Sequence, residues 1–185
     1  MKRKADYHRL FMVAGIIEAL ANDLIYYAND FLNHNNKLLP NPKRNGGYLV
    51  VMDAKNGEII LLMAIGSFST QKTEKYLNYA IGKAQQLFRH RNEHRLSFQS
   101  ALTEKFTQGA IQIGDYIWSF SGHLSGVDEA ISAVLGCKFS FSSIHESLQK
   151  KETQRLEVAL DNVSRNEIYP FLKASVKYQG EEPGY

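Results

Sequence analysis

The stretch from Gly109 to Gly136 constrains the fold of this chain more than any other segment. It reads GAIQIGDYIWSFSGHLSGVDEAISAVLG. Two short β-type runs are separated by Gly114 and Asp115, residues that accept turn conformations. A Gly/Ser turn then leads into an apolar helical pattern. The stretch therefore predicts an antiparallel hairpin whose second strand feeds directly into a packed helix.

Local signals predict that this helix covers Val127 to Leu135. Ser125 precedes Asp128 by three residues, a spacing typical of a helix N-cap, and Gly136 is typical of a helix end. Amides at a helix start can hold an anion such as phosphate. Because Asp128 and Glu129 bring negative charge into the first turn, we favour plain capping over phosphate binding in this turn.

Two further hydrophobic patterns predict helices. Apolar residues recur every three or four positions from Leu10 to Phe31, which indicates a long amphipathic helix after a charged, frayed start at residues 1–9. A second helix is expected at Lys72 to Phe88, after a cap at Ser69 or Thr70.

Alternating apolar runs predict a first hairpin. Its strands are expected at Tyr48 to Met52 and Glu58 to Ala64, and Asn56-Gly57 lies between them. Weaker patterns predict four short or less regular elements. These are a helix at Ser97 to Phe106, a strand at Lys138 to Phe141, a helix from Ile144 to Val163 behind a capping box at Ser143 and Glu146, and a short element at Asn166 to Phe171. The order favours an α+β fold in which helices cover an antiparallel sheet.

Several short motifs resemble the GlcG/HbpS family of haem-degrading-domain-like proteins. They are the strand and turn Val50-Val51-Met52-Asp53-Ala54-Lys55-Asn56-Gly57, the pair Lys83-Ala84, the turn Ser121-Gly122 and the helix start Asp128-Glu129-Ala130. The likeness covers about residues 10–138. His123 departs from it, because the family usually has a second glycine there, and the tail from Phe139 onward has no counterpart.

This resemblance implies profilin-like α/β/α layers in residues 1–141, and we expect a helical C-terminal extension with a loose tail in residues 142–185. It also implies a homo-oligomer that binds a small apolar ligand, with haem or another tetrapyrrole as the candidate. The extension, from Ser143 to Phe171, is a candidate for docking with a neighbouring chain. We therefore expect a small-molecule-binding or assembly protein; an enzyme of unknown reaction is the alternative.

Four residues are the candidates for binding: His123, Trp118, Ser121 and Gly122. His123 could be an axial ligand or an acid/base, since histidine titrates near neutrality, but a turn histidine hydrogen-bonded to its surroundings is the simpler interpretation. Trp118 shares one strand face with Tyr116 and Phe120. That face could line a flat pocket or a subunit interface, and core packing is the first expectation.

Other chemistry is less favoured. His90 to His94 reads H-x-x-E-H, yet three arginines crowd it, so we expect a solvated basic segment and no metal site. Cys137 is expected to be a buried structural thiol, and Asp53 to make local turn hydrogen bonds.

Composition limits the partners and the location. A formal charge of +3 is too small to demand a polyanion, so nucleic acid is not an expected partner. A single cysteine suits a reducing compartment, and no signal peptide or membrane helix is evident. We therefore expect a cytoplasmic protein.

Overall fold

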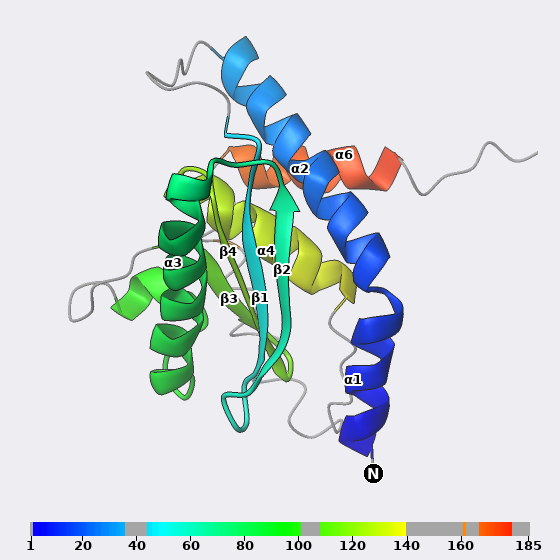
Figure 1. The fold of residues 1–185 in the computed structure, drawn as a ribbon, viewed down its shortest axis with the longest axis vertical. Coiled ribbons are helices and arrows are strands. Elements are labelled where there is room, and N and C mark those ends of the chain that lie inside the picture. The colour runs from blue at the N-terminus through cyan, green and yellow to red at the C-terminus, as the bar shows by residue number, and fades with distance from the viewer. Residues whose placement is uncertain (1, 36–43, 101–107, 140–160, 162–166, 179–185) are drawn as a thin grey trace, which may run out of the picture.

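The computed structural model describes residues 2–35, 44–100, 108–139, 161 and 167–178. Helices precede, separate and follow two pairs of strands along the chain (Figure 1). In order they are α1 (Lys2–Met12), α2 (Ala14–His34), β1 (Gly46–Asp53), β2 (Ile59–Gly66), α3 (Thr70–Arg89), the short 3-10 helix η1 (Ser97–Ser100), β3 (Ala110–Ile113), β4 (Tyr116–Ser121), α4 (Ser125–Phe139) and α6 (Ile168–Tyr178).

The strands form one antiparallel sheet in the order β2-β1-β4-β3. Both sequence-predicted hairpins are confirmed. Gly57 and Gly114 have φ values of 77° and 59°, in the left-handed region that turns of this kind use and glycine adopts cheaply. The central pair, β1 and β4, brings Tyr48 opposite Ser121 at one end and Asp53 opposite Tyr116 at the other.

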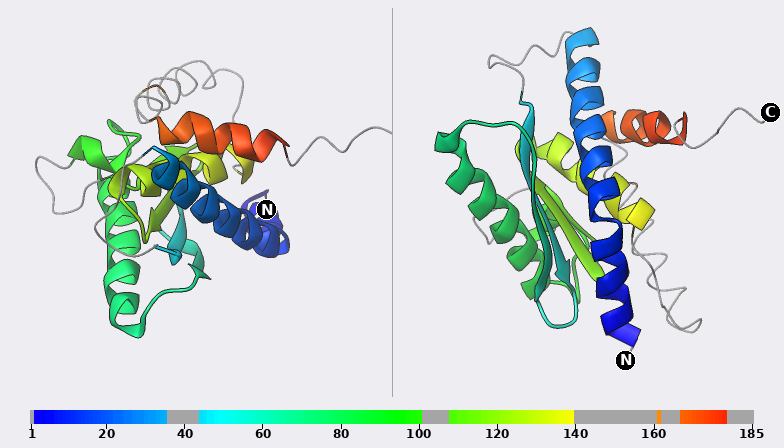
Figure 2. Two further views of the ribbon diagram at one scale, coloured as in Figure 1. Left: turned by 90° about the horizontal axis from the view of Figure 1, so that it is seen from above. Right: turned by 45° about the vertical axis from the view of Figure 1, so that its right-hand side comes forward.

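Helices cover both faces of the sheet, as the sequence predicted for an α+β fold (Figure 2). α3 packs on one face, over β1, β4 and β3. α2, α4 and α6 lie together on the opposite side, where α4 contacts β3 and β4. Two apolar cores result, because strand side chains alternate between the faces.

The three aromatic residues of β4 belong to the core on the α4 side. Tyr116, Trp118 and Phe120 share that face, and each is buried. The Trp118 ring stacks on Phe139 at 6.5 Å between centroids. Core packing, the first expectation for this face, is confirmed.

The N-terminal region differs from the prediction. Residues 2–9 were expected to be frayed, yet they belong to α1. The helix is interrupted at Val13, and α2 begins at the next residue. Tyr7 accounts for part of this order, because its hydroxyl donates a 2.6 Å hydrogen bond to Asp53 at the far end of β1. The charged residues of this segment therefore do not prevent helix formation, since Tyr7 hydrogen-bonds to the buried Asp53.

α4 is longer than the sequence predicted. Ser125 is its first residue and not its cap, and the helix passes through Gly136 to Phe139. A strand at Lys138 is therefore wrong. A Cβ added at Gly136 would lie 2.7 Å from Ile113 Cδ1 and 3.0 Å from Trp118 Cδ1, so this glycine provides room for the helix against the sheet and does not end it.

The C-terminal extension is described only in part. α6 packs on α2 and α4, with the Phe31 and Phe171 rings 4.9 Å apart. It continues beyond the short element expected at Asn166 to Phe171. The predicted helix after Ser143 and the boundary between residues 141 and 142 lie outside the described residues. No helix in the described part of the chain is long and apolar enough to cross a bilayer.

Candidate functional site

A pocket of about 330 Å³ opens between α3 and the end of the sheet where β1 begins and β4 ends. Its lining is mostly polar and is rich in cations. The lining residues are Arg44, Lys72, Lys75, Tyr76, Tyr79, Lys83, Ser121, His123, Ser125 and Asp128. The volume is typical of a site for a small molecule.

A buried ion pair forms one wall of the pocket. Lys83 Nζ, from α3, lies 2.9 Å from Asp128 Oδ2, in the first turn of α4, and both side chains are almost fully buried. The pair joins the helices of the two layers across the end of the sheet. Such a pair orders its surroundings, because losing one partner leaves the other charge buried and uncompensated.

The other oxygen of Asp128 holds the turn between β4 and α4. Asp128 Oδ1 accepts hydrogen bonds from the backbone N–H of Gly122 (3.2 Å) and of His123 (2.8 Å). The side chain that holds the chain before α4 is therefore Asp128, and not Ser125 as the sequence predicted. Ser125 remains exposed at the pocket rim, beside the amides at the start of α4.

Ser121 contributes a hydroxyl to the pocket lining. The residue is only 4% exposed, lies on the α3 face of β4 and lines the pocket. Among the described residues, none hydrogen-bonds to its Oγ. A hydroxyl in this position can donate a hydrogen bond to a ligand in the pocket.

Sequence reasoning missed the cationic side of this site. Lys72, Lys75, Tyr76, Tyr79 and Lys83 all belong to α3. Their spacing of three, four, seven and eleven residues from the first places them on one helix face. Lysines and tyrosines that recur at helical spacing in this segment were the sequence signal that could have indicated a cationic helix face.

Arg44 reaches the same pocket from the segment before β1. Its Nη1 donates a 2.5 Å hydrogen bond to the carbonyl oxygen of His123. Because Lys83 is paired with Asp128, the guanidinium of Arg44 and the ammonium groups of Lys72 and Lys75 leave the pocket with excess positive charge.

The negative charge expected in the first turn of α4 is largely offset. Burial raises the pKa of Asp128, Lys83 acts in the opposite direction, and the ion pair compensates the carboxylate. Burial also raises the pKa of Glu129 to about 8, so this carboxyl is mostly protonated at neutral pH. The sequence argument against an anion in this turn therefore loses its main support.

His123 is held as a neutral imidazole. Its Nδ1 accepts the N–H of Leu124 at 2.9 Å, so Nε2 carries the proton and donates to Asn29 Oδ1 at 3.1 Å. Burial, and next the positive charge of Arg44, lower the pKa of His123 to about 4. Both ring nitrogens are engaged, which fits the simpler of the two sequence interpretations.

The buried imidazole predicts a pH-dependent stability. His123 ionises near 6.5 in the unfolded chain and near 4 in the fold, so acid favours unfolding between these values. We expect the free energy of unfolding to fall by about 3 kcal/mol more in the wild type than in His123→Gln as pH drops through this window. Urea titrations at a series of pH values would measure it, and parallel curves would contradict it. Glu129 acts in the opposite sense, and equally in both proteins.

The structure separates the four sequence-predicted binding residues. Ser121 and His123 line the pocket, and Gly122 lies between them with its backbone against Gly47. Trp118 does not join them. It points to the opposite face of the sheet, into the core.

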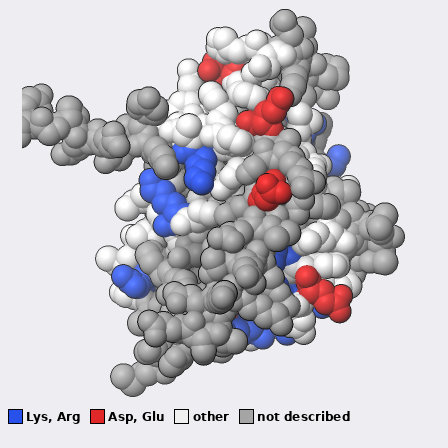
Figure 3. Space-filling model, turned by 180° about the vertical axis from the view of Figure 1, so that it is seen from behind, with Lys and Arg blue, Asp and Glu red and all other residues white. Residues whose placement is uncertain are grey.

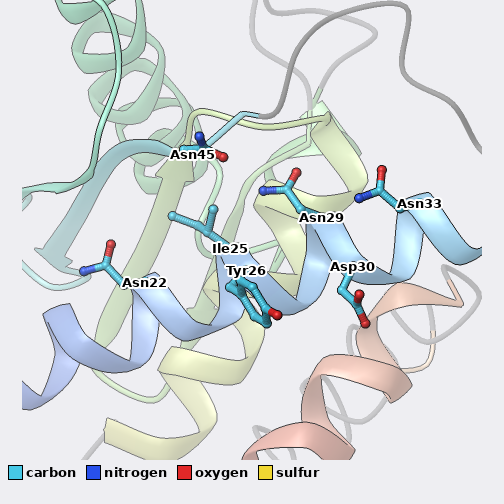
Figure 4. Close-up of a pocket in the computed structure, with 7 residues that line it drawn as sticks. All are labelled: Asn22, Ile25, Tyr26, Asn29, Asp30, Asn33 and Asn45. Atoms are coloured by element: carbon cyan, nitrogen blue, oxygen red, sulfur yellow. The ribbon is translucent and has the colours of Figure 1, made fainter.

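A second pocket, of about 410 Å³, lies along α2 (Figure 4). It is lined by Asn22, Ile25, Tyr26, Asn29, Asp30, Asn33 and Asn45. Six of these come from α2, and Asn45 faces them from the residue before β1. Its one charged lining residue is Asp30, and no cation lines it among the described residues, so the positive charge that could select an anion lies in the first pocket.

The other candidates show no reactive arrangement. The H-x-x-E-H motif lies in the turns after α3, and no group of three His, Cys, Asp or Glu side chains in the described part of the chain could hold a metal. Asp53 accepts the Lys55 N–H at 2.6 Å, which confirms its expected turn role. Cys137, expected to be buried, is exposed.

Comparisons with known proteins identify no relative. No protein-family model, no curated protein and no solved structure matches the chain. The likeness to the GlcG/HbpS family thus stays a prediction from short motifs. What the structure defines is a layered α/β/α domain with a basic pocket at one end of its sheet.

Proposed function

We propose that this chain is a small-molecule-binding protein whose ligand is a small anion bearing a phosphate or carboxylate group. The observation that carries the proposal is that Arg44, Lys72 and Lys75 line one pocket together with the hydroxyl-bearing Ser121. The start of α4 adds amide donors and a favourable dipole at the same place. Tyr76 and Tyr79 supply aromatic walls beside the cations.

The small formal net charge of +3 supports a small ligand over a polyanion. On the face opposite to that of Figure 1, Lys and Arg lie in several separate places with Asp and Glu between them (Figure 3). A nucleic-acid surface needs clustered cations along an extended track.

The binding role expected from the GlcG/HbpS resemblance is compatible with this proposal. Haem carries carboxylates that a basic rim suits, yet His123 has no free ring nitrogen for iron and Trp118 lies elsewhere. Haem binding, the enzyme alternative and the homo-oligomer therefore stay predictions, as does the cytoplasmic location. A Soret band on haem addition would test the first.

Calorimetric titration with inorganic phosphate and with citrate tests the proposal, with chloride at equal ionic strength as the control. We expect Lys72→Gln and Lys75→Gln each to weaken binding about tenfold, which corresponds to about 1.4 kcal/mol. Ser121→Ala should weaken it about fivefold, because one hydrogen bond is lost. Lys138→Gln removes the same charge from an exposed site at the far end of α4 and should change nothing.

Two outcomes would overturn the proposal. One is the absence of saturable binding by either anion. The other is an equal effect of Lys75→Gln and Lys138→Gln, which would show that the anions respond to net charge and not to this pocket.

A further inference from the structure

A cluster of aromatic rings borders the basic pocket. Phe68, between β2 and α3, makes edge contacts with Tyr48 of β1 at 5.3 Å and with Tyr76 of α3 at 5.7 Å between ring centroids. Tyr76 lines the pocket, and so does Tyr79, three residues further along α3. Three separate segments of the chain therefore bring aromatic rings to the side of the pocket that α3 forms.

The register of the sheet places Tyr48 directly beside the pocket. Tyr48 is paired with Ser121 of β4 on one side and with Ala64 of β2 on the other. Residues paired across an antiparallel ladder share one face of the sheet. Because Ser121 lines the pocket, the aromatic cluster begins where the cationic part of the pocket ends.

The rings of this cluster are only partly covered. Tyr48, Phe68 and Tyr76 are half-buried, and Tyr79 is 38% exposed. α3 packs on β1, β4 and β3, while β2 lies farther from it (Figure 1), and Ala64 beside Tyr48 is exposed. Open aromatic rings beside a polar pocket offer a flat apolar surface on which another planar ring can stack.

Helical spacing sets the distance between charge and ring. Lys72 precedes Tyr76 by four residues, and Lys75 precedes Tyr79 by four residues, so each tyrosine lies one turn after a lysine. The Lys75 Nζ is 5.9 Å from the centre of the Tyr79 ring. A ligand that contacts both groups must therefore carry its anionic group and its ring about one helical turn apart, which is about 5.4 Å.

We infer that the ligand of this pocket is a phosphate ester that carries one planar aromatic ring system, as a nucleoside monophosphate does; the inference rests on the proposed function. The phosphate lies among Arg44, Lys72 and Lys75, because its three terminal oxygens can accept hydrogen bonds from all three cations. The ring lies against Tyr76 and Tyr79. A pocket of about 330 Å³ suits a ligand with a single ring system.

Calorimetric titration with a matched set of phosphates tests the contribution of the ring. The set is inorganic phosphate, glycerol phosphate, phenyl phosphate and adenosine monophosphate. Phenyl phosphate and adenosine monophosphate should each bind about tenfold tighter than glycerol phosphate, since only they can stack on the tyrosines. Equal affinities for the three esters would overturn the inference and leave the proposed function intact. The absence of saturable binding by any phosphate would overturn both.

Variants of the two tyrosines assign the effect to this surface. Tyr76→Leu and Tyr79→Leu keep an apolar side chain and remove the ring, so each should weaken adenosine monophosphate about fivefold. Their affinity for inorganic phosphate should not change, which also shows that the pocket is folded. Tyr26→Leu is the control, because Tyr26 is 68% exposed on α2 and lies outside this pocket. An equal loss for both ligands in Tyr79→Leu, or an effect of Tyr26→Leu as large, would contradict the inference.

Discussion

Replacement of Lys83 by methionine is expected to lower the free energy of unfolding by about 3–5 kcal/mol. Methionine preserves most of the buried volume, so the loss comes from charge. It leaves the carboxyl of Asp128, which is 2% exposed, without its cation 2.9 Å away. The ammonium also reaches the carbonyl oxygen of Phe120 at 3.4 Å, and that contact is lost with it.

The loss should depend on pH in a defined direction. Burial already raises the pKa of Asp128, and removing Lys83 takes away the largest opposing influence. A carboxyl whose pKa is raised in the fold destabilises the protein increasingly as pH rises through that pKa. The difference between wild type and Lys83→Met should therefore be largest at neutral and alkaline pH and smaller in acid.

Two further variants make this experiment decisive. In Lys83→Met/Asp128→Asn the asparagine oxygen can still accept the amides of Gly122 and His123, and no charge is buried, so most of the loss should be recovered. Lys138→Met removes an exposed lysine of α4 and should change stability by less than about 0.5 kcal/mol. Urea unfolding measures all three; a loss below about 1 kcal/mol in Lys83→Met would show that the pair carries little energy.

Local chemistry explains why both hairpins could be predicted from the sequence. Gly57 and Gly114 lie between alternating apolar runs, and the turn needs only what these few residues provide. The aromatic face of β4 follows from the same alternation. α1 could not be predicted in this way, because its order depends on Tyr7 meeting Asp53, 46 residues away.

Most of the pocket could not be predicted from the sequence either, because its contacts join residues far apart in the chain. Lys83 and Asp128 are 45 residues apart, and Arg44 and His123 are 79 apart. The sequence argument about the first turn of α4 counted Asp128 and Glu129 as free charges. Only the fold pairs one of them with a lysine and buries the other, and that reverses the electrostatics of the turn.

The closest backbone approach at the pocket lies where β1 meets the end of β4. A Cβ added at Gly122 would meet the carbonyl oxygen of Gly46 and lie 2.6 Å from the Cα of Gly47. These are backbone atoms, so no side-chain rotation can relieve the contact. Gly47 and Gly122 do not have a positive φ, so space and not backbone conformation demands glycine here.

We expect Gly122→Ala to lower the free energy of unfolding by about 3 kcal/mol, the upper range for overpacking. The strands must separate where Ser121 lies, so phosphate affinity should fall as well. Gly15→Ala is the matched control: a Cβ there meets nothing within 4 Å in α2, and it should stabilise the protein by up to about 1 kcal/mol. If urea unfolding showed opposite signs for the two variants but unchanged phosphate affinity in Gly122→Ala, the glycine contact would support the sheet without shaping the pocket.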